Sequence, residues 1–158
     1  MTEPILKVEG ISKGFPGVQA LSDVHLSVSA GEVLVLVGEN GAGKSSLMKI
    51  LSGIYTKDAG HIYFNGAEVD ITSPLHAQQL GVTIIHQEMN LMSDLTVAQN
   101  IYIGREPRNG IFLSETKLNA QTTELLQRLE IALEPRQIVG ELTVAKQQMV
   151  EIAKALSF

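Results

Sequence analysis

Hydrophobic and polar residues alternate along part of the first half of the chain. Between residues 24 and 29, every second position is a valine or leucine and the positions between are polar, which is the period of a strand with one face in water. Residues 5–9 and 61–64 also resemble strands, and Asn65-Gly66 is a turn signal before Val69. These segments predict an antiparallel β-layer.

Two other segments, residues 33–37 and 82–85, are apolar without alternation. Continuous apolar runs of this length are typical of strands that are buried on both faces of a parallel sheet. The predicted fold class is therefore α/β, with an antiparallel β-layer around a parallel core.

The pattern changes to a helical period from about residue 94. Leucines form one stripe of the segment 118–129, and Glu124 and Arg128 are expected to form an i, i+4 pair on its other side. A loop is predicted over 104–110 and a last helix from about Thr143. The inner face of that helix is predicted to carry Ala145, Met149, Ile152, Ala153 and Leu156. Two parts follow from this pattern, an α/β core with its β-subdomain over 1–90 and a mainly helical subdomain over 91–158.

The strongest chemical signal comes directly after the apolar run 33–37. Residues 38–45 fit the phosphate-binding pattern G-x-x-x-x-G-K-[ST] at every fixed position. Glycines let such a loop fold tightly, so that backbone N–H groups point at an anion. Lys44 would supply positive charge to the outer phosphates, Ser45 a hydroxyl to Mg²⁺, and the following helix its positive dipole end. The residues expected to bind the nucleotide are Gly38, Glu39, Asn40, Gly41, Ala42, Gly43, Lys44, Ser45 and Ser46.

The spacing of the glycines excludes a second kind of phosphate loop. Glycines at 38, 41 and 43 give G-x-x-G-x-G, whereas a dinucleotide-binding turn requires G-x-G-x-x-G. A nucleoside triphosphate is therefore the expected ligand, and the 1–90 part is predicted to be the nucleotide-binding core.

Composition narrows the class of protein further. A chain of 158 residues with 44% hydrophobic content is long enough for a compact core. Lys and Arg number 12 against 17 Asp and Glu, a net charge of −5, so direct binding to nucleic acid is not expected. Cysteine is absent, which excludes disulfides and suits a reducing cytoplasm. Neither a signal peptide nor a membrane span is expected.

Three further segments accompany the phosphate loop in a fixed order. Phe15 lies upstream in Lys13-Gly14-Phe15-Pro16-Gly17-Val18-Gln19-Ala20-Leu21, Gln87 follows the apolar run 82–85, and Leu142-Thr143-Val144-Ala145-Lys146 opens the last helix. In this order the pieces resemble the nucleotide-binding subunit of ABC transporters, a P-loop NTPase. More narrowly, they resemble the ATPases of bacterial monosaccharide importers of the ribose, xylose and galactose type. The resemblance covers essentially the whole chain.

The resemblance implies a role for each of these segments. Phe15 would stack on adenine, and Gln87 would contact Mg²⁺ or the attacking water. The signature segment 142–146 would cap the γ-phosphate bound to the opposite subunit of a head-to-tail dimer, because a helix N-terminus with an N-cap hydroxyl attracts an anion. Ala145 and Lys146 depart from the family's L-S-G-G-Q pattern, and this leaves open whether the half-site is fully active.

Triphosphate hydrolysis also needs a carboxylate on Mg²⁺ and a residue that positions water. In the family these are an Asp-Glu pair after an apolar strand (Walker B), followed by a switch histidine, and no such pair occurs in this chain. No catalytic carboxylate is therefore assigned. The chain is expected to be an N-terminal piece, truncated before the Walker B strand, that binds ATP and Mg²⁺ but is inactive alone.

The implied function is the energy-coupling subunit of a sugar ABC importer. Its partners would be transmembrane permease subunits, a second ATP-binding cassette and, indirectly, a periplasmic sugar-binding protein. It would lie at the cytoplasmic face of the inner membrane as a peripheral protein. A soluble ABC-type ATPase outside transport, a P-loop kinase of small molecules and a nucleotide-sensing module without enzymatic activity are the alternatives. The transported sugar cannot be inferred from the sequence.

Overall fold

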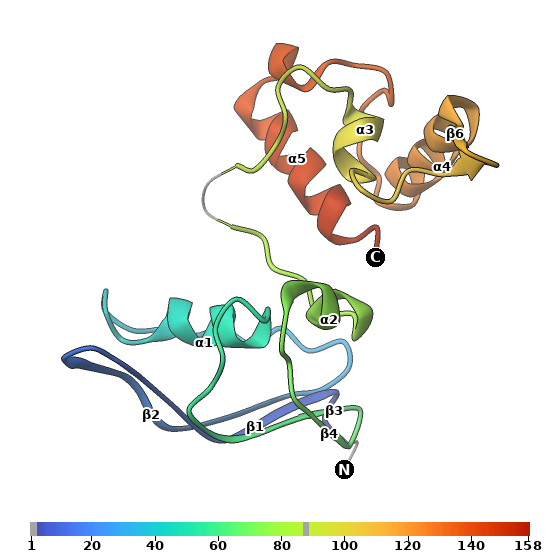
Figure 1. Ribbon diagram of the computed structural model, residues 1–158. Helices are drawn as coiled ribbons and strands as arrows, with labels where there is room; N and C mark the ends of the chain where they lie inside the picture. The colour runs from blue at the N-terminus through green and yellow to red at the C-terminus, as the bar shows by residue number, and fades with distance from the viewer. Residues whose placement is uncertain (1–2, 87–88) are drawn as a thin grey trace. The chain divides into compact units, whose positions relative to one another are not determined.

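The computed structural model describes residues 3–86 and 89–158. The chain divides into two compact units, Met1–Thr83 and Ile84–Phe158. Each unit has a hydrophobic core of its own, as two separate clusters of buried side chains show. Figure 1 shows the elements of both units.

The first unit contains a four-stranded antiparallel sheet. Its strands are β1 (Leu6–Phe15), β2 (Val18–Val28), β3 (Ala59–Phe64) and β4 (Ala67–Val69), in the order β2-β1-β3-β4. The alternation read from the sequence is confirmed, because strands form over the segments near 5–9, 24–28 and 61–64. Strands β1 and β2 run further than predicted and meet at the turn that contains Pro16 and Gly17.

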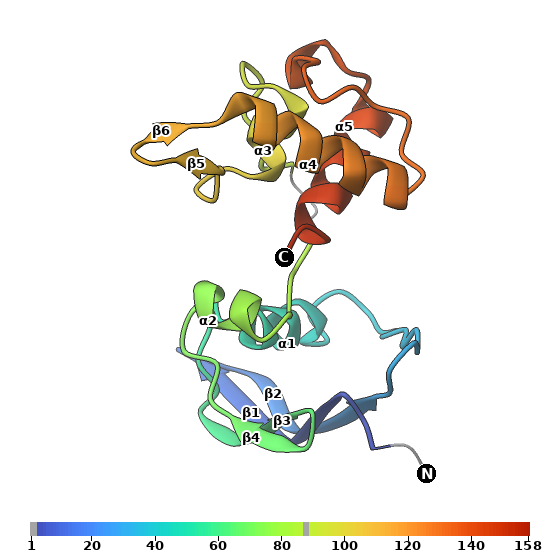
Figure 2. The ribbon, with the colours of Figure 1, turned by 90° about the vertical axis from the view of Figure 1, so that its right-hand side faces the viewer.

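Two helices, α1 (Lys44–Leu51) and α2 (Pro74–Gln79), lie over one face of this sheet (Figures 1 and 2). The other face carries polar and charged residues such as Lys7 and Glu9. The core consists of Val8, Ile11, Leu21, Leu47, Ile50, Leu51, Ile62, Ile71 and Ala77. Each large apolar side chain buried in this way stabilises the fold by about 1.5–3 kcal/mol. Helix α1 is therefore held by its apolar face against the sheet.

The parallel strands predicted for the core are not found among the residues that the structure describes. Residues 33–37 have no strand assignment, and Val33 and Val37 are 88% and 91% exposed. Residues 82–85 are not a strand either. A parallel strand obtains its backbone hydrogen bonds only from neighbouring strands, and no strand among residues 3–86 and 89–158 pairs with either run. Apolar character alone therefore did not make these segments strands.

The second unit is mainly helical. Its elements are α3 (Val97–Ile101), the hairpin strands β5 (Arg108–Asn109) and β6 (Phe112–Leu113), α4 (Glu115–Arg128), the 3₁₀ turn η1 (Val139–Glu141) and α5 (Val144–Ala155). The predicted loop over 104–110 contains β5. The predicted leucine stripe of α4 is confirmed, since Leu118, Leu125 and Leu126 are buried.

The buried face of α5 differs from the predicted one. Val150 and Ala153 are fully buried, whereas Met149 and Leu156 are 42% and 50% exposed. Only Ala153 belongs to both sets. The buried face is rotated because α5 packs on the cluster around Val97 and Leu126, and the helical period alone does not show where that neighbour lies.

A buried asparagine organises the segment that precedes α3. Asn100 is 1% exposed. Its side-chain oxygen accepts a hydrogen bond from the Met92 amide at 2.8 Å, and its nitrogen donates to the carbonyls of Met92 and Thr96 at 3.0 and 3.1 Å. The Asn100 side chain thus gives the Met92 amide its hydrogen-bond acceptor. It also adds a donor to the Met92 and Thr96 carbonyls, which accept backbone hydrogen bonds from the amides of Leu95 and Asn100 as well.

Replacing this side chain should destabilise the second unit. We expect Asn100→Ala to lower the free energy of unfolding by about 1–3 kcal/mol, because the Met92 amide loses its hydrogen-bond acceptor. Urea unfolding followed by circular dichroism measures the change. Asn119→Ala on the partly exposed side of α4 is the matched control and should shift stability by less than about 0.5 kcal/mol. Equal effects of the two substitutions would contradict this role of Asn100.

Candidate functional site

The glycine-rich loop at 38–45 runs directly into a helix. Helix α1 begins at Lys44, and its N-cap is Gly43, which has the left-handed value φ 85°. A tight turn precedes it, in which the Ala42 amide donates to the Glu39 carbonyl at 3.2 Å. The predicted loop therefore lies at a helix N-terminus, where backbone N–H groups and the helix dipole favour an anion.

Among the three glycines of the loop, Gly43 lies close against the sheet, whereas Gly38 and Gly41 do not. A Cβ added there would lie 2.4 Å from the carbonyl oxygen of Ala20 and 2.7 Å from a methyl carbon of Leu21, both in β2. Its positive φ also disfavours any side chain. The loop can approach β2 only because this residue is glycine.

Lys44 folds back over the loop. Its ammonium group donates hydrogen bonds to the carbonyls of Gly38 and Glu39 at 2.6 and 2.8 Å. The positive charge is therefore held at the loop, among the groups that would surround a phosphate. Helix α1 has no side-chain cap and no acidic residue in its first turn, so nothing in that turn competes with an anion.

The other predicted loop residues are on the surface. Residues 38–42 and Ser45 are exposed, and Ser46 is half-buried. The Ser45 hydroxyl makes no hydrogen bond to the part of the chain that the structure describes, which leaves it available as a ligand. A hard cation such as Mg²⁺ prefers oxygen ligands, so the donor chemistry of Ser45 fits this ion.

Phe15 ends β1 at the same end of the sheet as the loop. Lys13 pairs with Leu21 across β1 and β2, and Leu21 is the residue that Gly43 approaches. Phe15 is 37% exposed. Its ring contacts Tyr55 at 5.3 Å between centroids, with a 67° angle between the planes. An aromatic side chain is thus available beside the loop.

Two residues at this end of the sheet were missed by the sequence interpretation. Tyr55 follows α1 and contacts Phe15, and Asp58 hydrogen-bonds to Lys13 and to the Gly14 amide. These hydrogen bonds hold the pKa of Asp58 below its usual range, the Gly14 amide more than Lys13. Neither residue lies in a motif, and both lie 40 or more positions from the residues of β1 that they contact, so no local signal marks them.

The signature segment lies in the other unit, at the N-terminus of α5. Thr143 is the N-cap, and its hydroxyl accepts a hydrogen bond from the Lys146 amide at 3.5 Å. Gln147 donates to the carbonyls of Val139 and Leu142 at 3.0 and 3.3 Å, which secures the turn before the helix. Leu142 is half-buried, and the other predicted residues of this segment, Thr143, Val144, Ala145 and Lys146, are exposed.

One predicted site residue has no structural description. Gln87, expected to contact Mg²⁺ or water, lies outside the described residues. Among the residues that are described, no group of three His, Asp or Glu side chains could hold a metal ion. In the same residues, no helix has the length and apolar character needed to cross a membrane.

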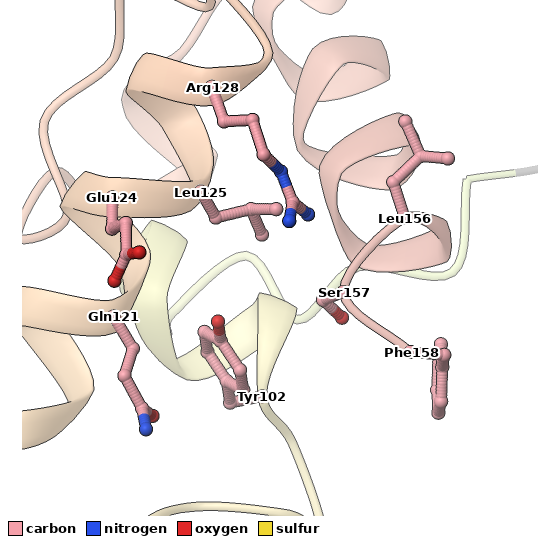
Figure 3. Close-up of a pocket in the computed structure, with 8 residues that line it drawn as sticks. All are labelled: Tyr102, Gln121, Glu124, Leu125, Arg128, Leu156, Ser157 and Phe158. Carbon is pink, nitrogen blue, oxygen red and sulfur yellow. The ribbon is translucent and has the colours of Figure 1, made fainter.

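The second unit also has a hollow of about 310 Å³ that contains no predicted site residue (Figure 3). It is lined by Tyr102, Gln121, Glu124, Leu125, Arg128, Leu156, Ser157 and Phe158. The expected Glu124–Arg128 pair is not among the ion pairs of the described residues. The Arg128 guanidinium instead extends toward the end of α5 in Figure 3.

Solved structures with the same architecture are ATP-binding cassettes. The chain matches the ADP conformation of an ATP-binding cassette of an ABC transporter, with a TM-score of 0.84 and 28% identity over 99% of this chain and 65% of that one. A nucleotide-free cassette of an ABC transporter matches with a TM-score of 0.83 and 28% identity, over 98% of this chain and 65% of that one. The predicted fold class, a P-loop core of the ABC type with an antiparallel β-layer and a helical subdomain, is thereby confirmed, apart from the parallel strands expected at 33–37 and 82–85.

Curated relatives carry one common description. A Burkholderia cenocepacia protein, "Putative ribose/galactose/methyl galactoside import ATP-binding protein 2", is 60% identical over 99% of this chain. A Pseudomonas syringae protein with the same description apart from the number is 53% identical over 98% of it. The chain spans 31% and 30% of the length of these two relatives.

A family model also matches most of the chain. Its description is ABC transporter, and it aligns with residues 21–157. That range begins in β2 and includes the phosphate loop, α1 and the signature segment. The chain therefore belongs to the ABC transporter family.

Proposed function

We propose that this chain is the ATP-binding part of the energy-coupling subunit of a sugar ABC importer. The observation that carries the proposal is the loop 38–45 at the N-terminus of α1, with the Lys44 ammonium group held on the Gly38 and Glu39 carbonyls. A triphosphate offers oxygens to replace those carbonyls as partners of the ammonium group. Family membership removes the small-molecule kinase alternative.

Each residue of the site would contact a different part of the nucleotide. The amides of 41–46 would donate to phosphate oxygens, and Lys44 would neutralise charge on the outer phosphates. Ser45 would hold Mg²⁺ through its exposed hydroxyl, with Gln87 as a further oxygen ligand. Mg²⁺ would supply charge neutralisation on the phosphates. Phe15 would stack on the adenine ring, since its partly exposed side chain lies at the same end of the sheet.

The exposed N-terminus of α5 supports a second role, toward a nucleotide held by another cassette. Thr143 leaves the first turn of α5 capped and exposed to solvent. A helix N-terminus attracts phosphate, and the positive charge of Lys146 adds to that attraction. Ala145, in place of glycine, narrows the space for close backbone approach. We therefore expect a functional half-site with weaker contact than a two-glycine segment would make.

Transport would use these sites in a cycle. ATP would close a dimer of two cassettes, hydrolysis would reopen it, and transmembrane permease subunits would follow the movement. The 1–90 part would bind nucleotide and the 91–158 part would carry the signature segment. The descriptions of the relatives support sugar as the cargo, supplied by a periplasmic binding protein to a complex whose ATPase lies on the cytoplasmic face of the inner membrane.

Removing the lysine of the loop tests the proposed nucleotide site. We expect Lys44→Ala to weaken Mg-ATP binding by about tenfold to a hundredfold, because a charge-assisted contact to phosphate is lost. Isothermal titration calorimetry on the whole chain measures the dissociation constant. The control is Lys7→Ala, which removes the same charge from the outer sheet face, where Lys7 pairs with Glu9. Unchanged ATP affinity in Lys44→Ala would reject the proposed site.

Two glycines of the loop give a matched test of its close approach to β2. Gly43→Ala should lower the free energy of unfolding by about 2–4 kcal/mol, since it adds a clash with the Ala20 carbonyl to the strain of a positive φ. Gly41→Ala has φ 88° but no atom within 4 Å of the new Cβ, so it should cost about 1 kcal/mol. Urea unfolding of both variants measures the difference. Equal losses of unfolding free energy in the two variants would show that the close contact of residue 43 with β2 adds nothing to the cost of the substitution.

A further inference from the structure

Asp58 is joined to the end of β1 by three hydrogen bonds. Its carboxylate accepts one from the Gly14 amide at 2.7 Å through Oδ2 and one from Lys13 Nζ at 2.6 Å through Oδ1. Its own amide donates to the Ser12 carbonyl at 3.0 Å. Both carboxylate oxygens are therefore committed to the two residues that immediately precede Phe15.

The position of Asp58 explains why these hydrogen bonds matter. The pairing of β1 with β3 ends at Ser12 and Ala59, and Asp58 is the next residue outward. Beyond Ser12, β1 pairs only with β2, and the register shifts between Lys13 and Gly14. Where β3 no longer pairs with β1, the Asp58 side chain thus supplies a hydrogen-bond acceptor to the last residues of β1. Without it, the segment that carries Phe15 would be supported on one edge alone.

Tyr55, which follows α1, supports the Phe15 ring. Its amide donates to the Lys49 carbonyl at 3.0 Å, in the turn that ends α1, and Lys49 Nζ lies 5.2 Å from the Tyr55 ring centroid. Tyr55 is half-buried and packs against the first core. Its ring meets the Phe15 ring in an edge-type arrangement, a favourable geometry for aromatic pairs. The helix that begins at the phosphate loop therefore also positions Phe15.

We propose that Asp58 is a positioning residue for a purine-binding platform made by the rings of Phe15 and Tyr55. Asp58 holds the backbone at Gly14, Tyr55 restrains the Phe15 ring, and the remaining exposed surface of Phe15 receives the base by stacking. The ligand class is a purine nucleotide whose phosphates lie in the loop 38–45, so this inference rests on the proposed function.

Asp58 contacts the end of β1 through two partners, the Gly14 amide and Lys13. Both keep the pKa of Asp58 low, so the carboxylate is charged at neutral pH. Lys13 Nζ also lies 5.7 Å from the centroid of the Phe15 ring, and the Lys13 side chain is 14% exposed against 50% for Asp58. The hydrogen bond to the backbone is directional and fixes the strand end that carries Phe15. The two contacts can be separated by substitution.

The test compares two ligands that differ in the base. Mg-ATP reports on both the phosphate loop and the platform, whereas magnesium tripolyphosphate reports on the loop alone. We expect Asp58→Ala to weaken Mg-ATP binding by about fivefold and to leave tripolyphosphate binding unchanged, since stacking of a base contributes about 1–3 kcal/mol and only part of it would be lost. Calorimetry on the whole chain gives both dissociation constants.

Further variants separate positioning from general stability. Asp58→Asn keeps a carbonyl acceptor for the Gly14 amide and should recover most of the ATP affinity, although the Lys13 ion pair is lost. Asp70→Ala is the matched control, because Asp70 also pairs with a lysine, Lys57 at 2.9 Å, but makes no contact with β1. Adding Asp58→Ala to Phe15→Ala should weaken ATP binding no further, since both act through the same ring.

The outcomes distinguish the inference from the proposed function. If the unmodified chain binds neither ligand, the proposed function fails and the platform with it. If it binds ATP and Asp58→Ala binds ATP equally well, the proposed function stands and the positioning role is wrong. An equal loss of affinity for both ligands in Asp58→Ala and Asp58→Asn would also overturn it, since that pattern indicates a general loss of structure. A loss confined to ATP and recovered by Asp58→Asn supports it.

Discussion

The close approach of Gly43 to β2 is the constraint on which the candidate site depends. The loop backbone lies against the Ala20 carbonyl, and a side chain at residue 43 would separate the two. This approach sets where α1 begins, and the burial of Leu47, Ile50 and Leu51 then holds the helix on the sheet. Helix, loop and sheet are thus tied at one point, and the free N-terminus of α1 is directed to solvent.

The same end of the first unit brings together three segments that are distant in the sequence. The β1–β2 turn region supplies Phe15, the loop supplies Lys44, and the turn after α1 supplies Tyr55. Asp58 links the last of these to the first through the Gly14 amide. Phe15 ends strand β1 and Lys44 begins helix α1, and side chains carried by regular elements lose less entropy when a ligand orders them.

In the second unit, the candidate anion site is again an exposed helix N-terminus, at the start of α5. The buried Asn100 shapes the backbone before α3, and pairing of Thr96 with Ile138 joins that segment to the turn before α5. Gln147 then fixes the turn, and Thr143 caps the helix. These hydrogen bonds hold the N-terminus of α5 in place while leaving it exposed. Recognition of phosphate by backbone groups requires an exposed helix N-terminus of this kind.

Much of this could be predicted from local sequence. The phosphate loop, the strands with one wet face, the Thr143 cap and the leucine stripe of α4 depend on residues within a few positions of one another, so spacing and side-chain chemistry determine them. Tertiary structure decided the rest. Val33 and its apolar neighbours are exposed because a parallel strand requires partners from elsewhere in the chain, and the buried face of α5 depends on which helix packs against it. The contacts of Tyr55 and Asp58 with the end of β1 join residues 40 or more positions apart, and only folding brings such residues together.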